Sequence, residues 1–172
     1  MLREKINEEI KKAMQEKSEL LLLVLRGINA AIKNKEIEKR TKLSKTSAFA
    51  GASADKEKLE KLEKESKLTE EEVIDVISAE AKKRRDSIVE FKKGNRNDLV
   101  EKEGKELEIL KRYLPEQMSE DQIRKEAKKV IAEIGAVGPK DTGKVMSALM
   151  FKVKGKAEGS MAGKIVGELL NG

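Results

Sequence analysis

The chain has 172 residues, with 38 basic and 32 acidic side chains, a formal net charge of +6, and neither cysteine nor histidine. These absences exclude disulfides, thiolate zinc sites, cysteine nucleophiles and imidazole acid–base chemistry. Charged residues make up 41% of the sequence and aromatic residues only 2%. Because strands favour aromatic and β-branched residues, this composition predicts an all-α protein whose helices have solvated outer faces.

The first two predicted helices follow from apolar residues at helical spacing. The first runs from Leu2 to Met14 and the second from Leu20 to Arg40. Apolar residues cover a wide arc of the second helix, so we expect it to be the central, most buried helix of a bundle.

The apolar pattern is interrupted between residues 42 and 67. Residues 44–54 are small and polar, which predicts a loop. The following stretch, Asp55 to Ser66, is rich in Lys and Glu with Leu59 and Leu62 on one side, and it predicts a short solvated helix. We interpret residues 42–67 as a flexible insertion.

Two further helices are predicted before the first proline. Thr69 with Glu72 forms a capping box that starts a long helix ending at Gly94. The next helix, capped by Asn97 or Asp98, ends before Pro115, because a residue that precedes proline is disfavoured in helical geometry. We place a domain boundary here, between residues 1–114 and residues 115–172.

Three short helices are predicted in residues 115–172. Ser119 and Gln122 form a second capping box, which starts a helix that Gly135 closes. Asp141 caps the next helix, and apolar residues from Ile165 to Leu170 indicate the last one. The predicted architecture is an N-terminal helical bundle followed by a small three-helix C-terminal domain.

The sequence predicts a cytoplasmic location without membrane contact. The N-terminus opens an amphipathic pattern and lacks the apolar core of a signal peptide. The longest apolar run, Leu20 to Leu25, is far shorter than the ~20 residues of a membrane span.

Two apparent catalytic motifs fail on inspection. Gly138 to Lys144 has the spacing of a phosphate-binding P-loop, but Val145 follows where the motif needs Ser or Thr, and a helix rather than a strand precedes it. The Ser-rich segment 44–53 has no histidine to activate a serine. We therefore predict no catalytic residue, no cofactor and no metal site.

A basic turn, Lys152 to Ala157, is the best candidate for binding a phosphate backbone. It lies between two predicted helices and so precedes a helix N-terminus, where backbone N–H groups attract phosphate. Four Lys and no Asp or Glu lie between residues 144 and 156. Aromatic residues for stacking on bases are scarce, which favours a folded RNA recognised through its backbone. The candidate RNA-binding residues are Lys144, Lys152, Lys154, Gly155, Lys156 and Lys164.

A second, weaker RNA-binding candidate lies in the predicted third helix. It consists of the consecutive residues Lys82, Lys83, Arg84 and Arg85. A run of this kind also fits the ordinary charged outer face of a helix, and that alternative is favoured.

The tail of the chain resembles the C-terminal module of the GatB/YqeY family. The likeness runs from Gly143 to Gly159 and includes Val145, Met146 and the Lys154-Gly155-Lys156 turn, then Ile165-Val166 and Leu169-Leu170. Upstream stretches resemble stand-alone YqeY proteins, namely Leu68–Val73, Arg84–Ile88, Arg96–Val100, Leu107–Leu110 and Tyr113–Gln117. The likeness covers nearly the whole chain outside residues 42–67. Phe151 and Gly163 depart from the family pattern, which often has Pro and Asn there.

The resemblance implies two helical domains and a tail that helps to bind tRNA, as the GatB subunit of tRNA-dependent amidotransferases does. It also implies a family-level link to carbon–nitrogen ligases that use glutamine as amido donor. Our leading hypothesis is a non-catalytic adaptor that binds tRNA, with amidotransferase subunits or a tRNA synthetase as further partners. The alternatives are a protein–protein interaction module that uses Phe151 and Met161, and a helical component that supports an amidotransferase in trans.

Overall fold

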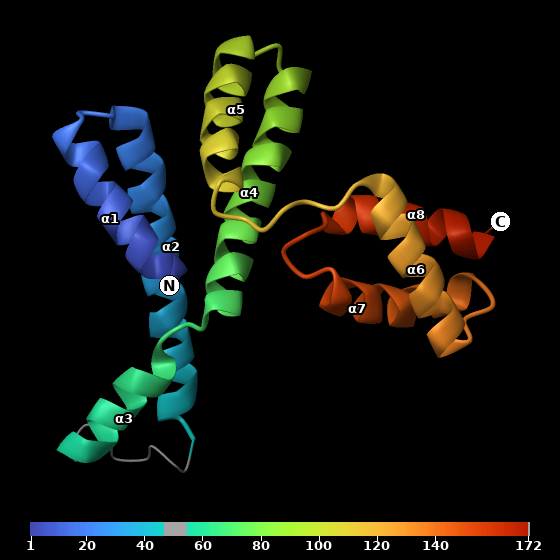
Figure 1. Ribbon diagram of the computed structural model, residues 1–172, viewed down its shortest axis with the longest axis horizontal. Helices are drawn as coiled ribbons and strands as arrows, with labels where there is room; N and C mark the ends of the chain where they lie inside the picture. The colour runs from blue at the N-terminus through green and yellow to red at the C-terminus, as the bar shows by residue number, and fades with distance from the viewer. Residues whose placement is uncertain (47–54, 172) are drawn as a thin grey trace. The chain divides into compact units, whose positions relative to one another are not determined.

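The computed structural model describes residues 1–46 and 55–171, and within these ranges every regular element is helical (Figure 1). This confirms the predicted all-α class. The predicted loop falls largely on residues 47–54, which lie outside the described residues. The chain divides into two compact units, Met1–Tyr113 and Leu114–Gly172, called here the N-terminal and C-terminal units.

The N-terminal unit is built from helices that pair as hairpins, α1 with α2 and α4 with α5 (Figure 1). Its largest fully buried side chains are isoleucines and a leucine: Ile6, Leu25, Ile28, Ile32 and Ile77. The helices are α1 (Leu2–Gln15), α2 (Glu19–Ser44), α3 (Lys56–Ser66), α4 (Glu70–Lys93) and α5 (Asn97–Lys111).

Helix α2 packs against the four other helices of the N-terminal unit, as expected for a central helix, but its apolar arc is only partly buried. Val24, Leu25 and Ile28 are buried, but Leu23 is 55% exposed. The reason is that α1, α3, α4 and α5 cover only part of the circumference of α2. The helix therefore buries a stripe, and part of its apolar surface faces solvent.

Helix α3 is more than the solvated helix predicted for this segment. Asp55 caps it, with its carboxylate accepting hydrogen bonds from the backbone N–H groups of Glu57 and Lys58 at 3.1 and 3.2 Å. Leu62 is only 3% exposed and packs with Leu43 of α2. The described part of the 42–67 segment is thus anchored on the rest of the unit.

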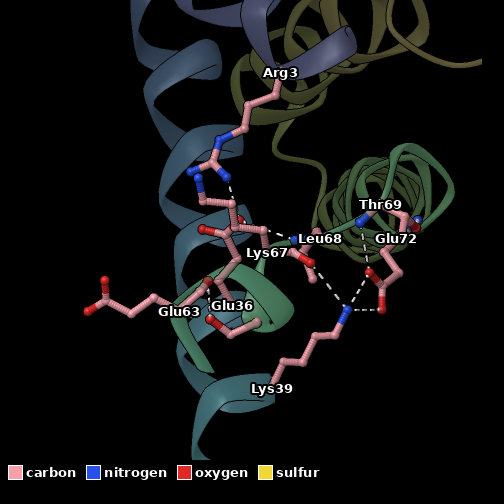
Figure 2. Close-up of polar contacts among 9 residues, drawn as sticks. Arg3, Glu36, Lys39, Glu63, Lys67, Leu68, Thr69 and Glu72 are labelled. Carbon is pink, nitrogen blue, oxygen red and sulfur yellow. Dashed lines mark hydrogen bonds and ion pairs between the residues drawn. The ribbon is translucent and has the colours of Figure 1, made fainter. Parts of the chain in front are cut away.

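Two charged side chains of α2 hold the connection between α3 and α4 (Figure 2). The Glu36 carboxylate accepts a hydrogen bond from the backbone N–H of Leu68 at 3.2 Å and pairs with Arg3 of α1. The Lys39 ammonium donates to the Glu72 carboxylate at 2.8 and 2.9 Å and to the Lys67 carbonyl at 3.2 Å. These contacts join α1, α2 and α4 with the connection that follows α3.

Both predicted capping boxes are confirmed. The Thr69 hydroxyl accepts from the Glu72 N–H at 3.2 Å, while the Glu72 carboxylate accepts from the Thr69 N–H at 2.8 Å. Ser119 and Gln122 make the same reciprocal pair at the start of α6. Each box satisfies N–H groups that a helix start leaves without partners.

The C-terminal unit contains α6 (Glu120–Ile134), α7 (Thr142–Lys152) and α8 (Gly159–Asn171), with a short 3₁₀ turn η3 (Pro139–Asp141) before α7. Gly135 closes α6 with a φ of 68°, a left-handed conformation that suits glycine. All three helices contribute to one apolar core: Ile123, Ala127, Val130, Val145, Leu149, Val153, Ala162, Ile165, Val166 and Leu170.

Candidate nucleic-acid interface

The basic turn joins α7 to α8 and is fixed to the core at its first bend. Val153 is 1% exposed, and its carbonyl accepts from the Lys156 N–H at 2.9 Å. Gly155 has a φ of 70°, a region that L side chains rarely adopt, so glycine is favoured there. Lys154 and Lys156 lie on either side of this glycine, and both are exposed.

The segment that precedes α6 lies against the basic turn. The Gln117 side-chain amide donates to the carbonyl of Gly155 at 2.8 Å and to the carbonyl of Pro115, also at 2.8 Å. Next to it, the Met118 N–H donates to the Lys156 carbonyl at 2.7 Å. The turn is therefore held by a segment almost forty residues earlier in the chain.

Three predicted lysines already have carboxylate partners within the C-terminal unit. The Lys152 ammonium lies 2.6 Å from a Glu133 carboxylate oxygen. The other two pairs, Lys144 with Asp141 at 3.7 Å and Lys164 with Glu168 at 3.9 Å, each lie within one helical turn. Among the described residues, the Lys156 ammonium makes no ion pair. The structure therefore leaves the predicted positive surface partly neutralised.

An acidic residue that the sequence interpretation overlooked lies at the start of α8. The Glu158 carboxylate accepts a hydrogen bond from the Ser160 hydroxyl in the first turn of the helix. Carboxylates are favoured at helix N-termini, where the partial positive charge of the helix dipole lies. Glu158 therefore competes with a phosphate at this helix start, and the lysines of the turn are the more accessible anion contacts.

In the second candidate face, Lys82 to Arg85 on α4, Lys83 and Arg84 pair with carboxylates of the same unit. The Arg84 guanidinium lies 3.2 Å from the Glu106 carboxylate, whose residue is 3% exposed, and 3.1 Å from Glu103. Lys83 pairs with Glu80 at 2.6 Å. Of the four residues, Lys82 and Lys83 are exposed. Arg84 thus ties α4 to α5 and does not belong to an open basic surface.

An open groove of about 730 Å³ lies between α2 and α4 in the N-terminal unit. Lysines and carboxylates alternate along it, and most are paired with each other. Glu38, for example, lies between Lys35 and Lys42, and their hydrogen bonds lower the pKa of its carboxyl group to about 2. The two signs of charge nearly cancel, so the groove does not select a charged ligand.

The part of the chain that the structure describes contains neither a group of metal ligands nor a membrane-spanning helix. In residues 1–46 and 55–171, no three His, Cys, Asp or Glu side chains group as a metal site. Over the same residues, no helix combines the length and the apolar character needed to cross a bilayer.

Only part of the site can be recognised from sequence. The Lys154-Gly155-Lys156 turn has a local signal, a glycine between two lysines. The Lys152–Glu133 pair and the Gln117–Gly155 contact join residues far apart in the chain, and nothing in the local sequence marks them. Glu158 is visible in the sequence, but its role depends on its place at the start of α8.

Several fungal proteins are similar to this chain, all named altered inheritance of mitochondria protein 41, mitochondrial. The chain is 36% identical over 109 residues to the protein from Lachancea thermotolerans, covering 63% of this chain and 46% of that protein. It is 34% identical over 108 residues to the Kluyveromyces lactis protein, covering 63% of this chain and 45% of that protein. The chain is 36% identical over 106 residues to the Saccharomyces cerevisiae protein, covering 62% of this chain and 44% of that protein. The chain therefore spans somewhat less than half the length of these relatives.

These relatives contradict the predicted cytoplasmic location, because their names place them in mitochondria. The prediction rested on the lack of a signal-peptide core and of a long apolar run, and neither feature distinguishes the cytoplasm from the mitochondrion.

A family model described as YqeY-like protein matches residues 3–170. The match extends from α1 to the last turns of α8, so it includes both units and the segment between α2 and α4. The chain therefore belongs to the YqeY-like protein family.

Proposed function

We propose that this chain is a non-catalytic adaptor that binds a folded RNA, of the tRNA class, through its C-terminal unit. The observation that supports this most is the exposed Lys154-Gly155-Lys156 turn, whose backbone conformation is fixed by Val153 and by Gln117. Lysine side chains used in this way act as point charges toward phosphate groups, and they bind without regard to base sequence.

The carboxylate partners of neighbouring lysines do not prevent such binding. The Lys152 and Glu133 side chains are 39% and 58% exposed, and exposed ion pairs contribute only about 0–1 kcal/mol. A phosphate of the RNA backbone can therefore replace the carboxylate at small cost. Because α6, α7 and α8 share one core, the lysines are presented on a rigid support.

The proposed binding mode depends on phosphate contacts and shape. The C-terminal unit has one aromatic residue in its sequence, Phe151, so a stacking platform for several bases is not available. Backbone recognition of a folded RNA needs no such platform. Binding is then expected to weaken steeply as salt concentration rises.

The test is filter binding of unfractionated tRNA to the full chain over a series of salt concentrations. A Lys152→Glu, Lys154→Glu, Lys156→Glu triple variant is expected to lose at least tenfold in affinity. Its log–log salt slope should also fall by about 1.4 to 2.7, since each lost phosphate contact removes roughly 0.7–0.9 from the slope and Lys152, already paired with Glu133, contributes less than a full contact.

The matched control is Lys11→Glu, Lys12→Glu, Lys33→Glu in the N-terminal unit. It makes the same change in net charge at exposed lysines of α1 and α2. The control is expected to bind tRNA within about twofold of wild type. Equal losses in the two triple variants, or none in either, would defeat the proposal.

We also propose a link to tRNA-dependent amidation, which rests on the resemblance to the GatB tail. The sequence offers no cysteine or histidine for an amidase of its own. Because the glutaminase of tRNA-dependent amidotransferases is a separate subunit, the purified chain is expected to release no ammonia from glutamine. Transfer of glutamine nitrogen to a charged tRNA should appear only when a separate amidotransferase is added, and should rise when this chain is included.

A second candidate function is a protein-interaction module, favoured by the exposure of two apolar residues. Phe151 is 83% exposed and Val137 is 95% exposed, both in the C-terminal unit. A pull-down after RNase treatment discriminates between the functions. A partner that wild type retains and Phe151→Ser loses supports protein binding, whereas loss of all partners with RNase supports the RNA adaptor.

A further inference from the structure

We infer that Gln117 is a positioning residue that fixes the basic turn and makes the segment before α6 part of the RNA-binding surface. This inference rests on the proposed function for the role of the lysines. The contact between Gln117 and the turn itself does not depend on that function.

The geometry of the Gln117 side chain supports this role. Its amide nitrogen donates to two backbone carbonyls, Pro115 beside it and Gly155 in the turn, both at 2.8 Å. A carboxamide has two N–H donors on one nitrogen, so both are used. Gly155 stands between the two exposed lysines, and its carbonyl is therefore held at the centre of the candidate site.

A second hydrogen bond, made by main-chain atoms, holds the basic turn next to the Gln117 contact. The Met118 N–H donates to the Lys156 carbonyl at 2.7 Å, and the Met118 side chain packs against the core of the C-terminal unit. Substitution of Gln117 leaves this bond in place. The turn would then be held at Lys156 but released at Gly155, which frees the Lys154 side of the turn.

Gln117 is exposed, so its loss should affect the turn more than the fold. An exposed side chain that makes two hydrogen bonds contributes little apolar burial. Its removal is expected to change the local opening of the turn, while the core of α6, α7 and α8 stays intact. This separates a positioning role from a general stabilising one.

The experiment compares Gln117→Met with wild type in the full chain. Methionine keeps the size and neutrality of glutamine but donates no hydrogen bond. Backbone hydrogen exchange by NMR should accelerate at Lys156 and Ala157, whose N–H groups both bond to the Val153 carbonyl. The tRNA affinity should fall about 2- to 10-fold, the equivalent of one or two net hydrogen bonds.

The matched control is Gln122→Met, which removes another exposed glutamine of the same unit. Gln122 closes the capping box of α6, with its side chain accepting from the Ser119 N–H at 2.8 Å. This variant should lower the melting temperature without accelerating exchange in the basic turn. Gln117→Met should accelerate exchange in the basic turn without lowering the melting temperature.

Two results would overturn the inference. One is unchanged exchange at Lys156 and Ala157 in Gln117→Met, which would mean that the amide does not hold the turn. The other is faster exchange with unchanged tRNA affinity, in a protein whose lysine triple variant does lose affinity. If the lysine triple variant binds like wild type, the proposed function itself has failed, and the exchange result alone decides whether Gln117 fixes the turn.

Discussion

At the scale of single residues, many charged side chains in residues 1–46 and 55–171 pair with other charged side chains of the same chain. Arg84 illustrates why a run of basic letters is a poor guide to a binding surface. Its neighbours in sequence suggest a basic patch, yet its guanidinium compensates the buried carboxylate of Glu106. Which lysines and arginines remain available for a ligand depends on packing between helices.

Arg84→Met is expected to destabilise the protein by about 3 kcal/mol, because it leaves the Glu106 carboxylate buried without its partner. The free energy of unfolding in urea measures this. Adding Glu106→Gln to Arg84→Met should recover part of the loss, since no buried charge then remains. Wild-type stability of the single variant would contradict this prediction.

Glu72 gives a pH dependence whose sign is fixed by its partners. The hydrogen bond from Lys39, and then that from the Thr69 N–H, lower the pKa of its carboxyl group. A lowered folded-state pKa stabilises the protein above the unfolded-state pKa, and this contribution is lost as pH falls through the folded-state value. The melting temperature of wild type should therefore fall more steeply than that of Glu72→Gln below about pH 4.3. Parallel curves would contradict this.

At the scale of helices, local sequence signals predicted where helices begin and end more accurately than they predicted which residues are buried. Thr69 and Ser119 open helices as their capping boxes indicate, and Gly94 and Gly135 close them. The predicted cap of α5 is wrong, because Arg96 occupies the N-cap position and Asp98 pairs with it at 2.8 Å. A helix cap depends on residues within four positions of one another, whereas burial depends on which helix from elsewhere in the sequence packs against the residue.

The contact of Leu62 with Leu43 is expected to anchor the charged helix α3 on the rest of the unit. Leu62→Ser should increase hydrogen exchange across Lys56–Ser66 by at least tenfold, because Leu62 is the main buried apolar side chain of that helix. Exchange in α1, α4 and α5 should change little. Lys61→Ser, an exposed position on the same helix, serves as the control, and equal effects of the two variants would contradict the prediction.

At the scale of the whole molecule, the sequence established the all-α class and the family but not the location. The fold class follows from composition, which is a property of the entire chain. The candidate site does not, since its lysines depend on Glu133, Glu158 and Gln117 for their charge environment and position. A compartment depends on signals that are separate from the fold.

Residues 114–172 have their own core, so this fragment is expected to fold alone. A domain this small is of marginal stability, and a low but cooperative melting transition is expected by circular dichroism. Its tRNA affinity should lie within about threefold of the full chain if the basic turn carries the binding, a difference of roughly 0.7 kcal/mol. A helical fragment without affinity would assign binding to residues 1–113.

If the C-terminal unit binds RNA as proposed, the pairing of Lys152 with Glu133 makes that binding an exchange of anions, in which the carboxylate leaves Lys152 as a phosphate arrives. Dissolved ions screen the departing carboxylate as well as the arriving phosphate. The two effects oppose each other at this lysine. A count of phosphate contacts taken from ionic-strength dependence will therefore fall below the number of lysines that touch the RNA.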